Sequence, residues 1–239
     1  PHFGREAVVI GVGGLTNMVS DFSQLLPAPL GPWIKAVYQV SYAELGFLMT
    51  IVFVVSCAVQ ASSGFVVDRF GPRPILFAGL ALLGTAAMGF AASTSYGMLA
   101  FFSVVAGIGN GVFHPVDYTL LNRKVSGPRL GHAYSVHGIT GSLGWALAPA
   151  MLVPLAMAFS WRVALVAAGV LAFAVLAVLL LHRDKLDLPA SAPVGAPAAA
   201  STKAAHGQEG KFDFLRIPAV WMCFAFFFFY AMALSVVQT

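Results

Sequence analysis

Long apolar runs, with few charges inside them and short connections between them, restrict the fold of this sequence more than any other feature. Charged residues make up 9% of the 239 residues and hydrophobic residues 59%, whereas a soluble domain carries about 25% charged residues. A soluble fold of this size could not keep so much apolar surface from water. Because a helix needs about 20 mostly apolar residues to cross a bilayer, the sequence predicts an all-α polytopic membrane protein.

Six complete spans and the start of a seventh meet this length requirement. The complete spans cover residues 7–30, 44–67, 74–92, 96–121, 130–159 and 162–181, and the seventh runs over 218–238. The stretch before the seventh is rich in Pro and Ala, which is typical of a flexible linker. We therefore expect an N-terminal six-helix bundle over 1–181, a cytoplasmic linker over 182–217 and the start of a second bundle over 218–239. Because the chain begins at Pro1 rather than Met, we also expect a longer protein, whose C-terminal half is a partner of this half.

The placement of Lys and Arg predicts the orientation of the spans, since the cytoplasmic ends of spans carry an excess of both residues. Lys35 and Arg162 lie at ends that face one side, and the other eleven basic residues lie at ends that face the opposite side. We expect the N-terminus and the linker in the cytoplasm, with the spans in the lipid bilayer of a bacterial inner membrane. The basic residues form no cluster large enough to bind phosphates, so nucleic acid is not an expected partner.

Polar side chains recur at helical spacing along spans 1, 2, 4 and 5. The spacing i, i+4, i+7 places three side chains on one helix face. The residues concerned are Asn17, Asp21 and Gln24; Ser56, Gln60 and Ser63; Asn110, His114 and Asp117; and His137 with Thr140. Spans 3 and 6 are almost uniformly apolar. The order polar, polar, apolar, repeated once, is typical of two inverted three-helix repeats, with spans 3 and 6 facing lipid and the others lining a wet cavity. Hydrogen bonds that merely join helices are the alternative interpretation.

The connection between spans 2 and 3 reads Gly64-Phe-Val-Val-Asp68-Arg69-Phe-Gly71-Pro-Arg73. It resembles the G-x-x-x-D-R-x-G-R-R/K loop signature of the major facilitator superfamily. The resemblance implies a secondary transporter that works by alternating access, in which this loop bridges helices and stabilises one state of the cycle. Pro74 stands where a third basic residue is usual. An ordinary charged turn that fixes the topology is the alternative. We also hypothesise that Asp68 pairs with Arg123.

Two further segments resemble drug efflux proteins of the fosmidomycin-resistance type. One is Gly107-Ile-Gly-Asn-Gly-Val-Phe-His114-Pro115 with the run that follows it to Arg123, and the other is residues 17–29. Span 5 is similar to the motif associated with antiporters, with generic tight packing as the alternative; its small residues and proline are Gly138, Gly141, Gly144 and Pro149. Many drug–proton antiporters carry an arginine in span 4 where this chain has Ser103, so the proton relay built on that arginine does not carry over.

Asp21 and Asp117 are the candidate proton-binding groups, with His114 and His137 as relay or tuning partners. A charged side chain in mid-bilayer costs about 2.5 to 3.5 kcal/mol on insertion scales, so such residues usually face a cavity or a partner. In the alternative, Asp117 pairs with Arg123 or Lys124 and serves only packing or topology. The predicted substrate and proton pathway comprises Asn17, Asp21, Gln24, Gln60, Asn110, His114, Asp117 and His137.

The function expected from these features is secondary transport of a small organic solute, as proton-coupled efflux. Proton-coupled uptake of an organic acid or metabolite is the alternative, and a channel or a membrane enzyme fits less well. The sequence contains no H-E-x-x-H, G-x-S-x-G or Walker motif, so we expect no catalytic site, cofactor or metal. His132 and His137 are five residues apart and therefore do not share a helix face. The sequence does not name the substrate.

Overall fold

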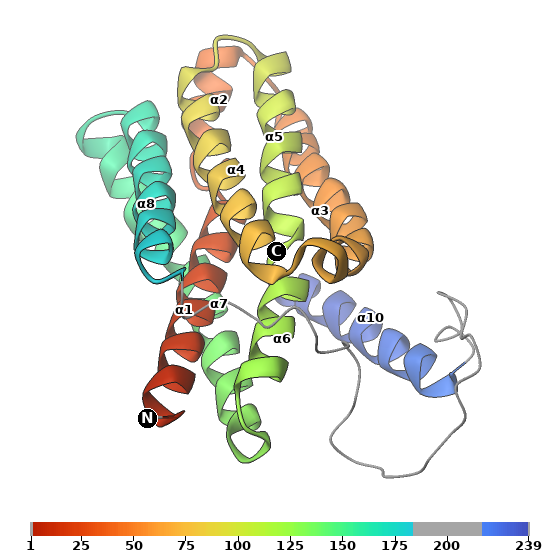
Figure 1. Cartoon of the computed structure of the whole chain (residues 1–239). Helices are drawn as coiled ribbons and strands as arrows, with labels where there is room; N and C mark the ends of the chain where they lie inside the picture. Colours follow the sequence, from red (N-terminus) through yellow and green to blue (C-terminus); the bar gives the residue numbers. More distant parts are fainter. Residues whose placement is uncertain (1, 184–216, 239) are drawn as a thin grey trace. The chain divides into compact units, whose positions relative to one another are not determined.

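The computed structural model describes residues 2–183 and 217–238, and all regular structure within them is helical (Figure 1). The predicted all-α fold is therefore confirmed. Helices α1 to α8 belong to one compact unit, and α10 (Pro218–Gln238) belongs to a second. Most of the expected linker, residues 184–216, lies outside the described residues.

Four helices follow the predicted spans with ends that differ by a few residues. They are α3 (Tyr42–Phe70), α4 (Pro72–Ala92), α7 (Gly127–Ala158) and α8 (Trp161–Leu181). α3 begins with a capping box, in which Ser41 and Glu44 each accept a hydrogen bond from the other's backbone, so two of the free N–H groups at this helix end are satisfied.

Span 1 differs from its prediction because its helix ends early. α1 (His2–Gln24) stops before Pro27 and Pro29, and a turn over residues 25–30 leads into the short helix α2 (Gly31–Tyr38). Proline has no N–H to donate to the preceding turn and its ring clashes with that turn, so the helix expected up to Leu30 is interrupted.

Span 4 also differs, since it consists of two helices rather than one. α5 (Tyr96–Gly111) ends one residue before Val112, and α6 (Phe113–Lys124) begins one residue after it. Pro115 cannot donate a hydrogen bond to the carbonyl of Gly111, four residues earlier. The break therefore lies between Asn110 and His114, in the middle of the predicted polar face.

Five helices of the described part are long and apolar enough to cross a membrane, with α5 and α6 taken together as one. They are the counterparts of spans 2 to 6. α1 is not among them, because its polar residues lower its hydropathy, and the apolar stretch of α10 is shorter, Pro218–Tyr230. The sequence predicted six complete apolar spans, whereas helix length and hydropathy identify five among the described residues.

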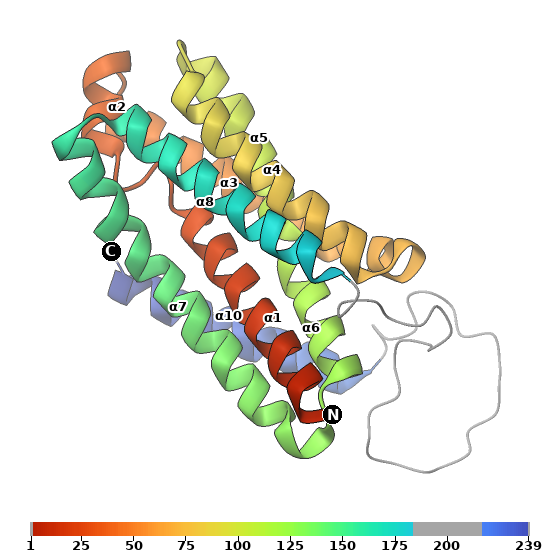
Figure 2. The same ribbon diagram turned by 60° about the vertical axis from the view of Figure 1, so that its left-hand side comes forward.

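The helices of the first unit pack mainly in four pairs: α1 with α7, α4 with α8, α3 with α5 and α4 with α5 (Figure 2). Glycines allow the closest approaches. A Cβ atom on Gly111 would lie 2.6 Å from the carbonyl oxygen of Ser56, and one on Gly107 would lie 2.8 Å from that of Val52. The apolar stretches of α3 and α7 are the least buried of the five, and that of α4 is the most buried. The prediction that spans 3 and 6 face lipid is not tested by this arrangement.

Buried apolar side chains form two cores. One includes Leu26, Phe90 and Leu152, and the other includes Val9 and Leu120. On α1 the two sets meet between Val19 and Phe22, beside Ser20 and Asp21. The polar side chains of the candidate site are therefore placed where one apolar core gives way to the other.

Side-chain contacts tie the helices together at both ends of the unit. At one end Arg129 of α7 forms an ion pair with Glu6 of α1, with 3.0 Å between Nη1 and Oε2. Desolvation raises the pKa of Glu6, but hydrogen bonds from Arg129 and Ser126 outweigh it, so this pKa lies below its ordinary value. At the other end Arg162 donates to the carbonyl oxygens of Ala91 and Ser93.

Candidate functional site

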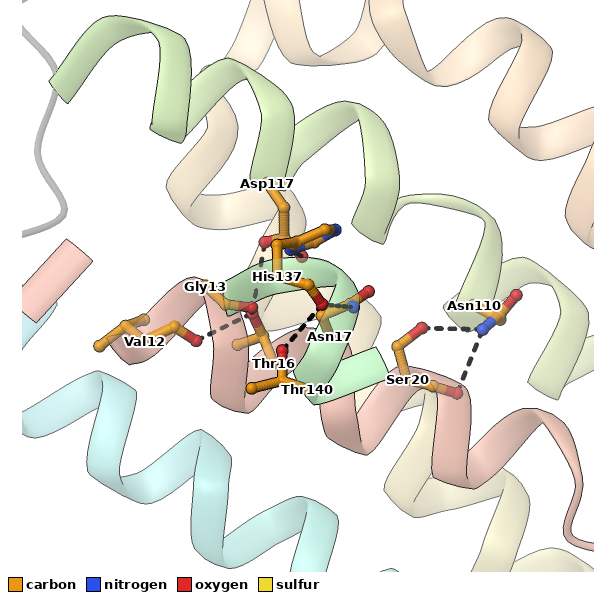
Figure 3. Close-up of polar contacts among 9 residues, drawn as sticks. All are labelled: Val12, Gly13, Thr16, Asn17, Ser20, Asn110, Asp117, His137 and Thr140. Atoms are coloured by element: carbon orange, nitrogen blue, oxygen red, sulfur yellow. Dashed lines mark hydrogen bonds and ion pairs between the residues drawn. The ribbon is translucent and has the colours of Figure 1, made fainter. Parts of the chain in front are cut away.

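Asn110 holds three helices together at the level of the helix break. Its Oδ1 accepts a hydrogen bond from Ser56 Oγ of α3 at 2.6 Å and one from Gln24 Nε2 of α1 at 3.4 Å. Its Nδ2 donates to Ser20 Oγ at 2.8 Å (Figure 3). Both ends of the amide are thus satisfied by protein, so Asn110 is bound into the structure rather than open to a ligand.

Asp117 is fully buried, at 0% exposure, on the side of α6 that faces α1. Its Oδ1 lies 3.3 Å from the hydroxyl of Thr16 (Figure 3). That hydroxyl also lies 3.0 Å from the carbonyl oxygens of Val12 and Gly13, and a hydroxyl has one proton to donate. The carboxylate therefore shares a single donor with two main-chain acceptors.

The second oxygen of Asp117 faces a histidine. Asp117 Oδ2 lies 4.0 Å from Nδ1 of His137 on α7, which is beyond hydrogen-bond distance. Asp117 forms no ion pair with Arg123 or Lys124. The alternative interpretation, in which Asp117 pairs with Arg123 or Lys124, therefore does not explain why this carboxylate is buried.

His137 is held through its main chain while its ring is left without a partner. Its carbonyl oxygen accepts hydrogen bonds from Asn17 Nδ2 and from Thr140 Oγ1, each at 2.9 Å (Figure 3). Both ring nitrogens are buried, and neither has a hydrogen-bond partner. His114 Nδ1, Asp117 Oδ2 and Asn17 Oδ1 are in the same condition. Buried polar atoms are nearly always paired, so this group of atoms is suited to a proton, water or ligand.

The carboxylate of Asp21 lies between α1 and α7, against a glycine. A Cβ atom on Gly141 would collide with Asp21 Oδ2 and would lie 2.7 Å from Asn17 Nδ2. Asp21 is half-buried. Within the described part of the chain it accepts no hydrogen bond and forms no ion pair. The missing side chain of Gly141 thus provides the space that this unpaired carboxylate occupies.

Four rings from α6 and α7 pack together beside these groups, and we call them the ring cluster: His114, Tyr118, Tyr134 and His137. The centroid of Tyr118 lies 5.3 Å from that of His137 and 5.6 Å from that of Tyr134. The centroid of His114 lies 6.0 Å from that of His137. Tyr118 is 43% exposed, so the ring cluster connects the buried Asp117–His137 contact with the surface of the unit.

Some predicted residues do not join this group. Gln60 is exposed, and its side chain makes no hydrogen bond. Of the predicted packing motif in span 5, Gly141 and Gly144 face α1, but a Cβ atom on Gly138 would meet nothing within 4 Å. Pro149 is exposed within α7. The period of the polar residues placed Gln60 of α3 on the face of Ser56, whereas the structure leaves its side chain exposed.

The loop after α3 has the backbone that its glycine predicts, but not the ion pair that we hypothesised. Gly71 has a φ of 81°, which favours glycine, whereas Gly64 has open space around it. Arg69 lies over the ring of Phe70, and Arg73 is the second residue of α4. Asp68 and Arg123 form no ion pair with each other.

Sequence reasoning missed Thr16 and Ser20 as parts of the polar network, and treated Tyr118 only as part of a resembling segment. Thr16 and Ser20 are each one residue away from a predicted side chain, Asn17 or Asp21, so a wider polar face on span 1 was the available signal. Among the described residues no group of three or more His, Cys, Asp or Glu could hold a metal ion.

Comparison with known proteins places this arrangement in a family. The profile of the Major Facilitator Superfamily matches residues 13–239. The membrane sensor protein UhpC of Salmonella typhimurium is 28% identical over 180 residues, which is 75% of this chain and 41% of UhpC. A multidrug resistance protein B homolog of Mycobacterium tuberculosis is 30% identical over 120 residues, which is 50% of this chain and 22% of that protein.

A third relative is the probable sulfoacetate transporter SauU of Cupriavidus necator, 24% identical over 68% of this chain and 38% of its own length. The chain therefore spans less than half the length of each of these relatives. The inward-open xylose transporter XylE of E. coli superimposes with a TM-score of 0.66 at 15% identity, over 74% of this chain and 48% of XylE, a likeness of fold alone. From the family profile and the apolar helices together, this integral membrane chain belongs to the Major Facilitator Superfamily.

Proposed function

We propose that this chain is the N-terminal half of a secondary transporter that exports a small organic solute by alternating access in exchange for protons. The observation that carries the proposal is the buried Asp117 carboxylate, which has one shared donor and faces the unpaired ring of His137 across 4.0 Å. An ionised carboxylate in such a place needs a compensating charge or a proton. His137 is the nearest group able to carry either.

The ring cluster gives such a proton a route toward the surface. His114 lies next to His137, with 6.0 Å between the ring centroids, and stacks on Tyr118. Imidazoles and phenols can both donate and accept a proton. Asp21 on α1 provides a second carboxylate, which is half-buried and unpaired in the described part. We assign Asp117 and Asp21 as proton-binding groups, with His137 and His114 as their relay.

The arrangement of the whole protein belongs to the same proposal. The polar, polar, apolar order supports two inverted repeats, and the placement of Lys and Arg supports a cytoplasmic N-terminus in a bacterial inner membrane. The resemblance to fosmidomycin-resistance-type proteins and the similarity to the multidrug resistance protein B homolog support export. We place the start of the second half of the transporter at residue 218, with residues 182–217 as the linker.

The test is solute movement in inverted membrane vesicles that contain the full-length protein, with and without an imposed pH gradient, over a panel of organic anions and drugs. We expect the gradient to drive movement, and Asp117→Asn to reduce that movement at least about tenfold, because removing an interaction of about 1.5 to 3 kcal/mol with a charged group has that effect. Asp21→Asn should have a similar effect.

Thr85→Val is the matched control, since Thr85 is exposed on α4 and its hydroxyl bonds only to Ala81 of its own helix. Full gradient-driven transport by both Asn variants would refute coupling at these carboxylates. Because one relative is named a sensor, the readout has to be movement of solute rather than binding alone. Solute that binds without moving would refute the transport proposal.

Uptake of an organic acid is the second candidate, and the similarity to the sulfoacetate transporter favours it. The same vesicles separate the two. Export from the cell appears as accumulation inside inverted vesicles with an acidic interior, whereas proton-driven uptake appears as accumulation in right-side-out vesicles with an acidic exterior.

A further inference from the structure

The polar network of the described helices contains two carboxyl groups and no Lys or Arg. Asp21 lies in the last turn of α1 and Asp117 in the second turn of α6, and both border the polar network. Each Lys and Arg of the described residues lies in the first or last turn of a helix or in a connection, and none of them forms a hydrogen bond or ion pair with this network. An ionised carboxylate here would attract a cationic group that enters this region and repel an anionic one.

The unpaired carboxylate of Asp21 on α1 and the unpaired ring of His137 on α7 lie at neighbouring levels along α7. Asn17 Nδ2 donates to the carbonyl of His137, and Asp21 Oδ2 occupies the space at Gly141, one helical turn further along α7. One turn corresponds to about 5.4 Å. A single small molecule can therefore reach the Asp21 carboxylate and the ring cluster together.

The ring cluster offers flat faces with unused nitrogen atoms. His137 is 5% exposed, and both its ring nitrogens lack partners. His114 and Tyr118 stack nearly parallel, with 21° between the ring planes, while Tyr118 stays 43% exposed. Faces of aromatic rings attract cations and stack with other flat rings, and a neutral imidazole has one nitrogen that accepts a hydrogen bond.

We propose that this face binds a planar aromatic organic cation, whose charged group pairs with Asp21 and whose ring packs on the ring cluster. The inference rests on the proposed function and names the class of substrate for the same site. Asp117, which is fully buried and lies against Thr16 and His137, binds only the proton, whereas Asp21 binds a proton and the charged group of the substrate in turn.

Equilibrium binding without any pH gradient tests this inference apart from coupling. The purified full-length protein in lipid nanodiscs is titrated with ethidium, a planar aromatic cation, and with 1-anilinonaphthalene-8-sulfonate, a planar aromatic anion. We expect ethidium to bind and Asp21→Asn to weaken its binding about tenfold or more, because a charge-assisted contact is lost. The anion should bind more weakly, and Asp21→Asn should not weaken it.

Two further variants separate binding from folding. Tyr118→Phe keeps the ring face and should keep ethidium affinity, whereas Tyr118→Leu removes the face and should weaken the affinity several-fold, about the value of one cation–π or stacking contact. Thr85→Val should leave binding unchanged. Anion binding tighter than cation binding, or ethidium binding indifferent to Asp21→Asn, would overturn the inference. Ethidium that binds through Asp21 but moves independently of the gradient would support the inference and refute proton coupling.

Discussion

The amide of Asn110 satisfies its hydrogen-bonding groups against α1 and α3 at once, through Ser20 and Ser56. At the residue scale, Asn110 is therefore the side chain of the polar network that we expect to contribute most to stability, because buried polar groups stabilise a fold when they are paired. The ring nitrogens of His137, in contrast, are both unpaired. Asn110 thus joins the helices, whereas the His137 ring is available to bind a proton or a ligand.

Asn110→Ala should therefore destabilise the protein without touching Asp117. The variant leaves the buried hydroxyls of Ser20 and Ser56 without a partner, and each such group costs about 1 to 3 kcal/mol. We expect a clear drop in the midpoint of unfolding in mixed micelles. Gln60→Ala, on an exposed side chain, should stay within about 0.5 kcal/mol of wild type. Equal stability of the two variants would contradict the role of Asn110.

Sequence pattern predicted single residues well where one helix face carries several polar groups. Asn17, Asp21 and Gln24 all lie on the side of α1 that meets α5 and α7. The pattern could not distinguish a paired amide from an unpaired ring, because that depends on which side chain a neighbouring helix presents. Gln60 shows the limit: its spacing matched Ser56 and Ser63, yet it is exposed.

At the scale of elements, the contact between α1 and α7 depends on two glycines. A Cβ atom on Gly144 would overlap the main-chain carbonyl of Met18, and one on Gly141 would overlap the side chain of Asp21. The first obstacle is backbone and the second is a side chain able to turn away. Gly144 therefore allows the short distance between α1 and α7, and Gly141 allows the observed position of the Asp21 carboxylate.

Gly144→Ala should destabilise the protein by about 1 to 3 kcal/mol, the usual cost of overpacking. Gly141→Ala should cost less stability and instead reduce gradient-driven transport, since Asp21 has to move. Gly138→Ala is the matched control on the same helix, because nothing lies within 4 Å of its added carbon. Unfolding midpoints and vesicle transport are measured for all three. A Gly144→Ala variant as stable as Gly138→Ala would contradict the close contact.

Helix existence followed directly from apolar length, but helix interruption did not. Pro27, Pro29 and Pro115 were visible in the sequence, and prolines are tolerated inside membrane helices where neighbours satisfy the freed groups. Pro149 and Pro154 lie inside α7 without ending it. Which prolines break a helix depends on the surrounding packing, and this is why the ends of span 1 and the middle of span 4 were mispredicted.

At the scale of the whole molecule, the alternating helices place the basic connections at one end. In Figure 2 the start of α1 and the α6–α7 connection lie at the same end, and α2 and the α4–α5 connection lie at the other. The orientation that we propose for this unit makes the first end cytoplasmic.

Cysteine labelling checks this orientation. In a protein without Cys57 and Cys223, Thr94→Cys at the α4–α5 connection should react with a membrane-impermeant maleimide in intact cells. Ser126→Cys at the α6–α7 connection should react only in inverted vesicles. Thr94 and Ser126, the two positions to be labelled, are both exposed. The reverse labelling pattern would show that the Lys and Arg bias does not set the topology here.

The bond between Asn17 and the carbonyl of His137 joins residues 120 positions apart. At about 5 to 20 residues per second, the ribosome needs roughly 6 to 24 s to make the second partner after the first. During that interval the side-chain amide of Asn17 cannot form this hydrogen bond, because α7 has not yet been made. In addition, α1 is not among the five described helices that are apolar enough to cross a membrane. Although α1 is made before the other described helices, this hydrogen bond of α1 can form only after α7 has been made. We therefore expect the stable insertion of α1 to depend on its contacts with α7 as well as on its own hydropathy.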